Sequence, residues 1–152
     1  SAAAAPQASI LPAAIVRHAS ALRLVGITCV GNEADIVEAF VRHNLGLLDH
    51  LVILEHNTLD GTREILDRLV AEGLPISVEH STEKQFLQLI FTNRLLRRAL
   101  EAEHADWVFP IDCDEFLLVP SRAALDAALD AVRDRLVGST SCWRREIADW
   151  GR

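Results

Sequence analysis

Three acidic side chains follow an apolar stretch in the second half of the chain. Asp112, Asp114 and Glu115 come directly after residues 107–111, which are all apolar. A strand that ends in Asp-x-Asp places both aspartates at its tip and on one face, because alternate side chains share a face. Acids this close repel each other unless a divalent cation lies among them, and Mg²⁺ is often held by one or two carboxylates together with substrate phosphates. The segment predicts a metal–diphosphate site with Asp112 and Asp114 as the metal ligands.

The same residues have a plainer interpretation as an exposed turn after a buried strand, because aspartate is common in turns. That interpretation is strong for one aspartate. Two aspartates and a glutamate after so apolar a strand favour the functional interpretation. Cys113, between the aspartates, is predicted to turn its thiol toward packing and to have no chemical role, although its backbone could contact a ligand.

Polar residues also gather after two other predicted strands. Glu55 ends an apolar run, where an acid usually has a partner or a ligand, and its carboxylate could accept hydrogen bonds from a nucleobase imide or a ribose hydroxyl. Asn32 is predicted to cap a helix with Glu33 in its first turn, so helix capping competes with ligand binding there. Asn57 and Asp60 likewise suit a turn that enters a helix.

The elements that must position these residues alternate regularly between strand and helix. The hydrophobic pattern predicts four strands with a helix after each, which indicates an α/β fold with a mainly parallel sheet flanked by helices. In such sheets ligands bind beyond the carboxyl ends of the strands, near the point where strand order reverses. The predicted strands are 22–29, 51–55, 75–79 and 106–112, and the last two helices are 86–104 and 120–138.

Composition limits the partners. Half of the 152 residues are apolar, which is typical of a globular domain, and the net charge of −7 argues against nucleic acid as a partner. No apolar run approaches the roughly 20 residues of a membrane helix. The three cysteines form no CxxC pair, so a cytoplasmic setting is expected. We expect residues 1–20 to be a flexible leader, residues 21–152 to be the domain, and the chain to be a fragment of a longer protein.

Two enzyme classes fit the sequence less well than a metal–diphosphate site does. The chain has neither GxGxxG after its first strand nor a Walker lysine loop, which disfavours a dinucleotide oxidoreductase. A phosphohydrolase could use Asp-x-Asp as nucleophile and acid. That chemistry typically places the pair after the first strand, whereas here it follows the fourth.

Taken together, three segments resemble a family 2-type glycosyltransferase of the GT-A fold. They match a bacterial subgroup in order and spacing over residues 22–118, and they are Cys29-Val-Gly-Asn32-Glu33, then Glu55-His-Asn57-Thr-Leu-Asp60-Gly-Thr62, then Trp107-Val-Phe-Pro-Ile-Asp112-Cys-Asp114-Glu115-Phe116. The resemblance implies a Rossmann-like, nucleotide-binding sheet, a UDP- or GDP-linked sugar donor, a Mn²⁺ or Mg²⁺ ion, and transfer with inversion. A carbohydrate or lipid-linked acceptor is implied too, together with a membrane-peripheral location for the full protein.

The resemblance also assigns roles to residues. Glu33 and Glu55 would contact the nucleoside with Asp60 supporting that pocket, Asp112 would approach the ribose or the metal, and Asp114 would bind the metal. Asn32, Asn57 and Cys113 belong to the same motifs and are assigned to the donor site, and Asn93 matches a polar position of the subgroup.

The chain departs from the subgroup in ways that leave the donor open. Gly31 stands where a basic residue is common, Glu55 replaces an aspartate, and His56 departs from a pair of acids. In this family the acceptor half and the catalytic base follow the Asp-x-Asp strand, and no general base is identifiable here. We therefore expect the donor-binding part of the enzyme, with a non-catalytic nucleotide- or metal-binding fragment as the alternative.

Overall fold

The structure is a computed structural model that describes residues 22–84 and 87–137. The predicted leader and any element after Val137 lie outside the described residues. Strands and helices alternate along the chain as the sequence pattern predicts. They are β1 (Leu24–Val30), α1 (Val37–Asn44), β2 (His50–His56), α2 (Thr62–Ala71), β3 (Ile76–Ser81), α3 (Gln88–Glu101), β4 (Trp107–Pro110) and α4 (Arg122–Val137).

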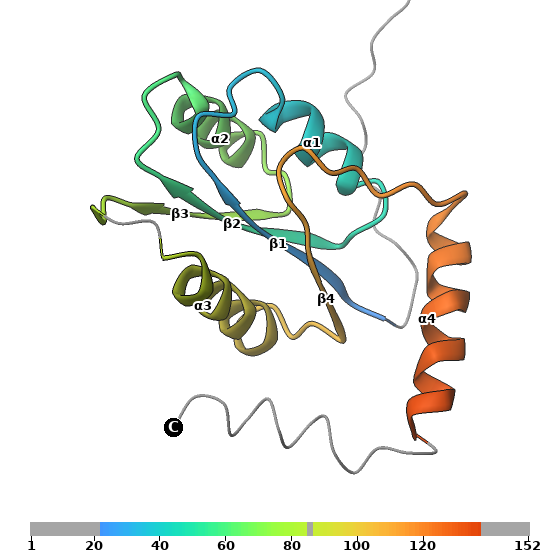
Figure 1. The fold of residues 1–152 in the computed structure, drawn as a ribbon. Coiled ribbons are helices and arrows are strands. Elements are labelled where there is room, and N and C mark those ends of the chain that lie inside the picture. The colour runs from blue at the N-terminus through green and yellow to red at the C-terminus, as the bar shows by residue number, and fades with distance from the viewer. Residues whose placement is uncertain (1–21, 85–86, 138–152) are drawn as a thin grey trace, which may run out of the picture.

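The four strands form one parallel sheet in the order β3-β2-β1-β4. The chain builds outward from β1 to β3 and then returns to place β4 on the other side of β1 (Figure 1). Strand order therefore reverses between β1 and β4. This is a Rossmann-like α/β arrangement, and it confirms the predicted fold class.

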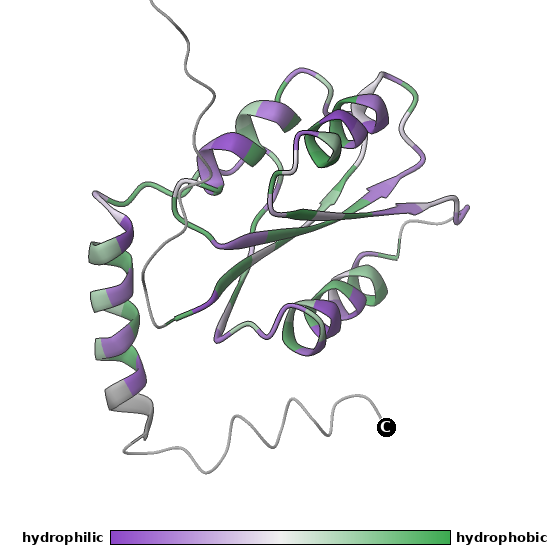
Figure 2. Cartoon of the chain, turned by 180° about the vertical axis from the view of Figure 1, so that it is seen from behind, coloured by the Kyte–Doolittle hydropathy of each residue, from purple (hydrophilic) through white to green (hydrophobic). Residues whose placement is uncertain are grey.

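Helices cover both faces of the sheet, which explains why its central strands are almost continuously apolar. Helices α1 and α2 lie on one face and α3 on the other (Figure 1). Val25 and Ile27 pack with Phe91 of α3, whereas Leu24 and Leu51 belong to the core under α1 and α2. In Figure 2 the sheet between the helices is largely hydrophobic and the outward helix faces are hydrophilic.

Helix α4 is fastened to the domain by a buried arginine. The guanidinium of Arg122 donates to the carbonyl oxygen of Leu22 at 2.7 Å and pairs with Asp49 at 2.9 Å. Ser121 accepts a hydrogen bond from the amide of Ala124 at 3.1 Å, in agreement with the helix start predicted at Pro120 and Ser121. Burial of a paired charge needs several acceptors at once, and only the tertiary fold brings these together.

Most predicted boundaries differ from the structure by one to three residues, and two of the differences concern the candidate site. Strand β4 ends at Pro110 instead of residue 112, because the chain turns there and the amide of Glu115 donates to the carbonyl oxygen of Asp112 at 2.9 Å. The aspartates therefore lie on a turn, and strand alternation is not what places them. Helix α1 begins at Val37, and the prediction that Asn32 caps it is wrong, since Asn32 is in the left-handed region with φ of 53°.

A close approach of side chains to Gly26 in the middle of β1 yields a stability prediction. A Cβ there would lie 2.5 Å from Leu51 Cδ2 and 2.9 Å from Leu48 Cδ1, and both leucines are buried. Gly26→Ala is expected to lower the free energy of unfolding by about 1–3 kcal/mol through overpacking. Urea unfolding measures it, with Gly31→Ala as the control, because a Cβ there meets nothing nearer than 3.7 Å. Equal losses in the two variants would contradict the expectation.

Candidate functional site

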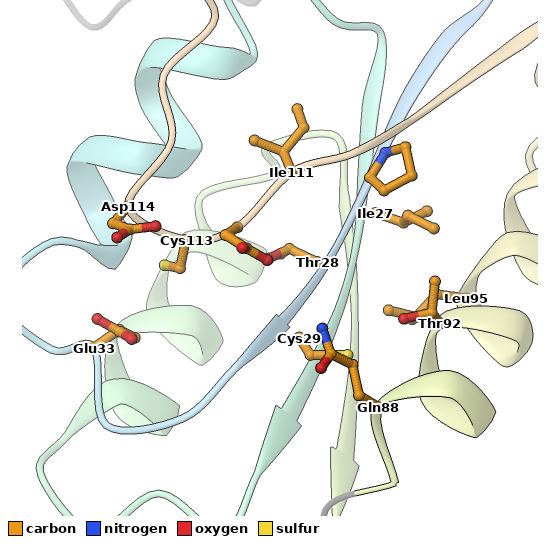
Figure 3. A pocket seen from close by; sticks show the side chains of 12 residues that line it. Ile27, Thr28, Cys29, Glu33, Gln88, Thr92, Leu95, Ile111, Cys113 and Asp114 are labelled. Carbon is orange, nitrogen blue, oxygen red and sulfur yellow. The ribbon is translucent and has the colours of Figure 1, made fainter.

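A cleft of about 460 Å³ opens at the carboxyl ends of β1 and β4. This is the point where strand order reverses, and ligands of open α/β sheets bind at such points. Strand β1, the loop after it, the turn after β4 and helix α3 supply the walls (Figure 3). The lining residues are Ile27, Thr28, Cys29, Glu33, Gln88, Thr92, Leu95, Pro110, Ile111, Asp112, Cys113 and Asp114.

Three of these residues are acids, and none is lysine, arginine or histidine. Within the described part of the chain, Glu33, Asp112 and Asp114 have no side-chain hydrogen bond or ion pair. Their charge acts on the two cysteines of the cleft. Burial and then Asp112 raise the pKa of the Cys29 thiol, and burial, Glu33 and Asp114 raise the pKa of Cys113 to about 12. The cleft is therefore strongly negative.

The two ends of the cleft differ in polarity. Glu33 and Asp114 lie at one end, and Gln88, Thr92 and Leu95 lie at the other (Figure 3). The α3 end is uncharged, with one amide, one hydroxyl and an apolar floor. An anionic group with a cation suits the first end, and an uncharged group suits the second.

Glu115 does not join the other two acids of its motif. Its Oε2 accepts a hydrogen bond from the amide of Asp112 at 3.1 Å, so the side chain folds back on the turn and does not line the cleft. Glu33, which arrives from the loop after β1, is the third acid of the cleft. Its place after the first predicted strand made Glu33 a candidate, but its position beside Asp112 and Asp114 depends on the pairing of β1 with β4.

The acids fit a metal ion that completes its coordination with ligand oxygens. Over residues 22–84 and 87–137, no group of three or more His, Cys, Asp or Glu side chains could hold a metal ion. Asp112 and Asp114 alone give the small carboxylate set with which Mg²⁺ is typically bound, the remaining positions being filled by water and substrate phosphates. The donor set suits a hard cation brought together with an anionic ligand.

Cys113 is 5% exposed and packs in the core under α1, which confirms the predicted direction of its thiol. Contact between its backbone and a ligand stays a prediction. Asn93 is exposed on α3 and is not among the lining residues. The structure adds Thr28, Gln88 and Thr92 to the cleft. Gln88 and Thr92 are four residues apart on one helix, and this spacing was the available signal.

Glu55 is fully buried, and both of its oxygens are engaged. Oε1 accepts the amide and the hydroxyl of Thr58 at 2.8 and 2.6 Å, and Oε2 pairs with Arg63 at 2.7 Å and with His80 Nδ1 at 2.8 Å. Burial raises the pKa of Glu55, but the hydrogen bonds from Thr58, His80 and Arg63 outweigh it and lower the pKa to about 2. The carboxylate stays charged and holds the loop after β2.

Hydrogen bonds join the loop after β2 to the loop after β1. The amides of Glu33 and Ala34 donate to Thr62 Oγ1 at 2.8 Å and Asp60 Oδ2 at 3.0 Å, and the Thr62 hydroxyl donates to Asp60 at 2.6 Å. The amide of Leu59 donates to Asn32 Oδ1 at 2.8 Å. These contacts, which we call the loop clasp, fix the backbone on both sides of Glu33.

Asn57 faces away from this clasp. Its Nδ2 donates to the carbonyl oxygen of Glu83 at 2.7 Å, and its φ of 49° is left-handed. Of the polar residues singled out after β1 and β2, only Glu33 lines the cleft. Asn32, Glu55, Asn57 and Asp60 shape the loops around it.

Comparison with known proteins shows which solved structures have a similar fold. No family model and no curated protein matches the chain. Among solved structures, it is similar to the mannosyltransferase PcManGT from Pyrobaculum calidifontis in complex with GDP-Man and Mn²⁺, with a TM-score of 0.52 and 22% identity. The chain has a glycosyltransferase-like fold. The match covers 71% of this chain but 31% of that one, so the chain spans less than a third of the mannosyltransferase. None of the described helices is both long and apolar enough to cross a membrane.

Proposed function

We propose that this chain is the donor-binding part of a metal-dependent glycosyltransferase of the GT-A type. The observation that carries the proposal is a cleft at the switch point where, among residues 22–84 and 87–137, three carboxylates have no partner and no cationic side chain is part of the lining. A diphosphate cannot approach such a cleft unless a divalent cation comes with it. The similar fold of a mannosyltransferase in complex with GDP-Man and Mn²⁺ supports the same conclusion.

In this proposal Asp112 and Asp114 hold Mn²⁺ or Mg²⁺ at the acidic end of the cleft. The bound cation would neutralise charge on the departing nucleoside diphosphate. Glu33 accepts hydrogen bonds from donor hydroxyl groups beside the cation. Asn32 and Asp60 act on the donor through the loop clasp, and the Cys113 backbone lies close enough to the aspartates to contact the diphosphate.

The uncharged end of the cleft is then left for the nucleoside. Gln88 carries both a donor and an acceptor, and these can pair with the lactam edge that guanine and uracil share. Glu55 and Asn57 contribute by shaping the loop after β2, and Asn93 is outside this contact set. A UDP- or GDP-linked sugar is the donor class that we propose.

The second half of the reaction needs groups beyond this cleft. Transfer with inversion requires a general base within hydrogen-bond reach of the acceptor hydroxyl. Aspartates that hold the cation cannot serve as that base. We propose that the acceptor, a carbohydrate or a lipid-linked sugar, is bound by protein outside the described residues. Since the chain spans less than a third of the mannosyltransferase, donor binding without turnover is the alternative outcome for this chain alone.

Calorimetric titration with GDP and with UDP tests the proposal. With Mn²⁺ present, at least one of the two is expected to bind with 1:1 stoichiometry, and EDTA is expected to remove the binding. Guanosine and uridine, which lack the diphosphate, serve as matched ligands whose binding should not depend on the metal. Equal nucleotide affinity in Mn²⁺ and in EDTA would refute the proposal. Release of phosphate from a phosphomonoester, lost in Asp112→Asn, would favour a phosphohydrolase instead.

A further inference from the structure

The carboxyl end of α1 is fastened to the chain just beyond the two aspartates. Asn44, the last residue of α1, is fully buried. Its Nδ2 donates to the carbonyl oxygens of Phe40 at 3.1 Å and Glu115 at 3.2 Å, and its Oδ1 accepts from the amide of Leu117 at 3.1 Å. Every hydrogen-bonding group of this amide side chain is therefore used, and two of the three bonds go to the segment after Asp114.

The preceding residue acts on the same segment from the surface. His43 Nε2 donates to the carbonyl oxygen of Leu117 at 2.8 Å. Phe116 lies edge-on to the ring of His43 at 5.2 Å and to the ring of Phe40 at 6.5 Å. The main chain of residues 115–117 is thus held by hydrogen bonds to side chains of α1 on both sides of a packed aromatic ring.

The other end of the turn is fixed as well. The amide of Ile111 donates to the carbonyl oxygen of Ile27 at 3.1 Å, which ties the entry of the turn to β1. Between these two anchors lie Asp112 and Asp114, whose carboxylates have no partner among the described residues. Two such acids repel each other, and a free turn would let them move apart.

We propose that Asn44 and His43 are positioning residues for the Asp112–Asp114 pair. The inference rests on the proposed function, because it concerns the cation that the pair would hold. By fixing residues 115–117, α1 keeps both carboxylates near one point before the cation arrives, so less conformational freedom is lost on binding. Neither residue touches the cation or the ligand. Both act through the backbone of the turn.

The test compares the Mn²⁺ concentration at half-saturation of nucleotide binding, using GDP or UDP, whichever binds the unmodified chain. Asn44→Ala and His43→Ala are expected to raise this midpoint about 10- to 100-fold, the loss typical when an outer partner of a metal ligand is removed. His43→Gln, whose amide can donate from nearly the same place, is expected to restore most of the affinity. His104→Ala, which removes an exposed histidine beyond the end of α3, is the matched control and should leave the midpoint unchanged.

A second readout needs neither metal nor nucleotide. Hydrogen exchange at the amide of Leu117 is expected to accelerate in Asn44→Ala and His43→Ala without a matching change at the amides of β1. If Asn44→Ala does not fold, His43→Ala decides, because His43 is exposed. If the variants fold and reach half-saturation at the same Mn²⁺ concentration as the unmodified chain, the positioning role is wrong and the proposed function is unaffected. Absence of Mn²⁺-dependent binding in the unmodified chain would overturn the proposed function itself.

Discussion

Replacing Asp114 by asparagine is expected to abolish Mn²⁺-dependent nucleotide binding, with the dissociation constant rising about 100-fold or more. This rise is larger than the roughly 10- to 100-fold loss of affinity that follows when only an outer partner of a metal ligand is removed. The reason is the composition of the cleft, whose described lining residues include no lysine or arginine that could compensate for a lost cation. Asparagine keeps the shape of the side chain and removes the charge that attracts the metal.

The measurement is the calorimetric titration already described, made in Mn²⁺ and in EDTA. Asp130→Asn is the matched control, since it changes the same residue type on α4, away from the cleft. In EDTA, Asp114→Asn should bind nucleotide no more weakly than the unmodified chain, because one repelling charge has been removed. If Asp114→Asn binds nucleotide in Mn²⁺ as tightly as the unmodified chain does, the metal is held elsewhere.

Glu55→Gln is expected to produce the largest loss of stability, about 3–5 kcal/mol in the free energy of unfolding at neutral pH. The carboxylate is fully buried and accepts from Thr58, Arg63 and His80. The glutamine amide would turn its own donors toward Arg63 or Thr58 and leave their donors unsatisfied. Urea unfolding checks the value, and Glu101→Gln, an exposed acid at the end of α3, should change it little. A loss below about 1 kcal/mol, typical of exposed pairs, would contradict the expectation.

The same residue should give the unmodified chain a distinctive acid sensitivity. The pKa of Glu55 falls from 4.5 to about 2, so the charged form is favoured in the folded state. Its contribution is fully present above pH 4.5 and is lost as the pH falls toward 2, which amounts to roughly 3 kcal/mol. Between those pH values the stability of Glu55→Gln should therefore fall less steeply than that of the unmodified chain. Parallel stability curves would show that Glu55 is not the group responsible.

The order and type of the strands and helices follow from the hydrophobic periodicity and from the turn-forming residues between segments. Apolar runs of five to eight residues separated by amphipathic helices permit one regular arrangement, a parallel sheet with helices on both faces. Boundaries were less accurate where main-chain bonds decide them. The turn after Pro110 depends on the bond between Glu115 and Asp112, and the late start of α1 depends on the left-handed Asn32.

The sequence predicted where in the fold the candidate site lies, but it predicted only some of the residues that line it. Asp112 and Asp114 stood out because two aspartates separated by one residue are unusual directly after an apolar strand. The roles of the acids around them depend on contacts between distant segments. Glu55 pairs with Arg63, eight residues away, and with His80, twenty-five residues away. The carboxylate of Glu33 has no partner among the described residues, and Glu33 lines the cleft. No local pattern distinguishes those two outcomes.

The loop clasp has a consequence for how this domain can be altered. Because the side chains of Asn32 and Thr62 accept hydrogen bonds from backbone amides of the opposite loop, neither loop fixes its conformation by itself. A segment transplanted from another protein into 31–36 would lack its counterpart in 57–62. The two loops form a single unit of exchange, and the conformation of either one can be transferred between domains of this kind only by moving both together.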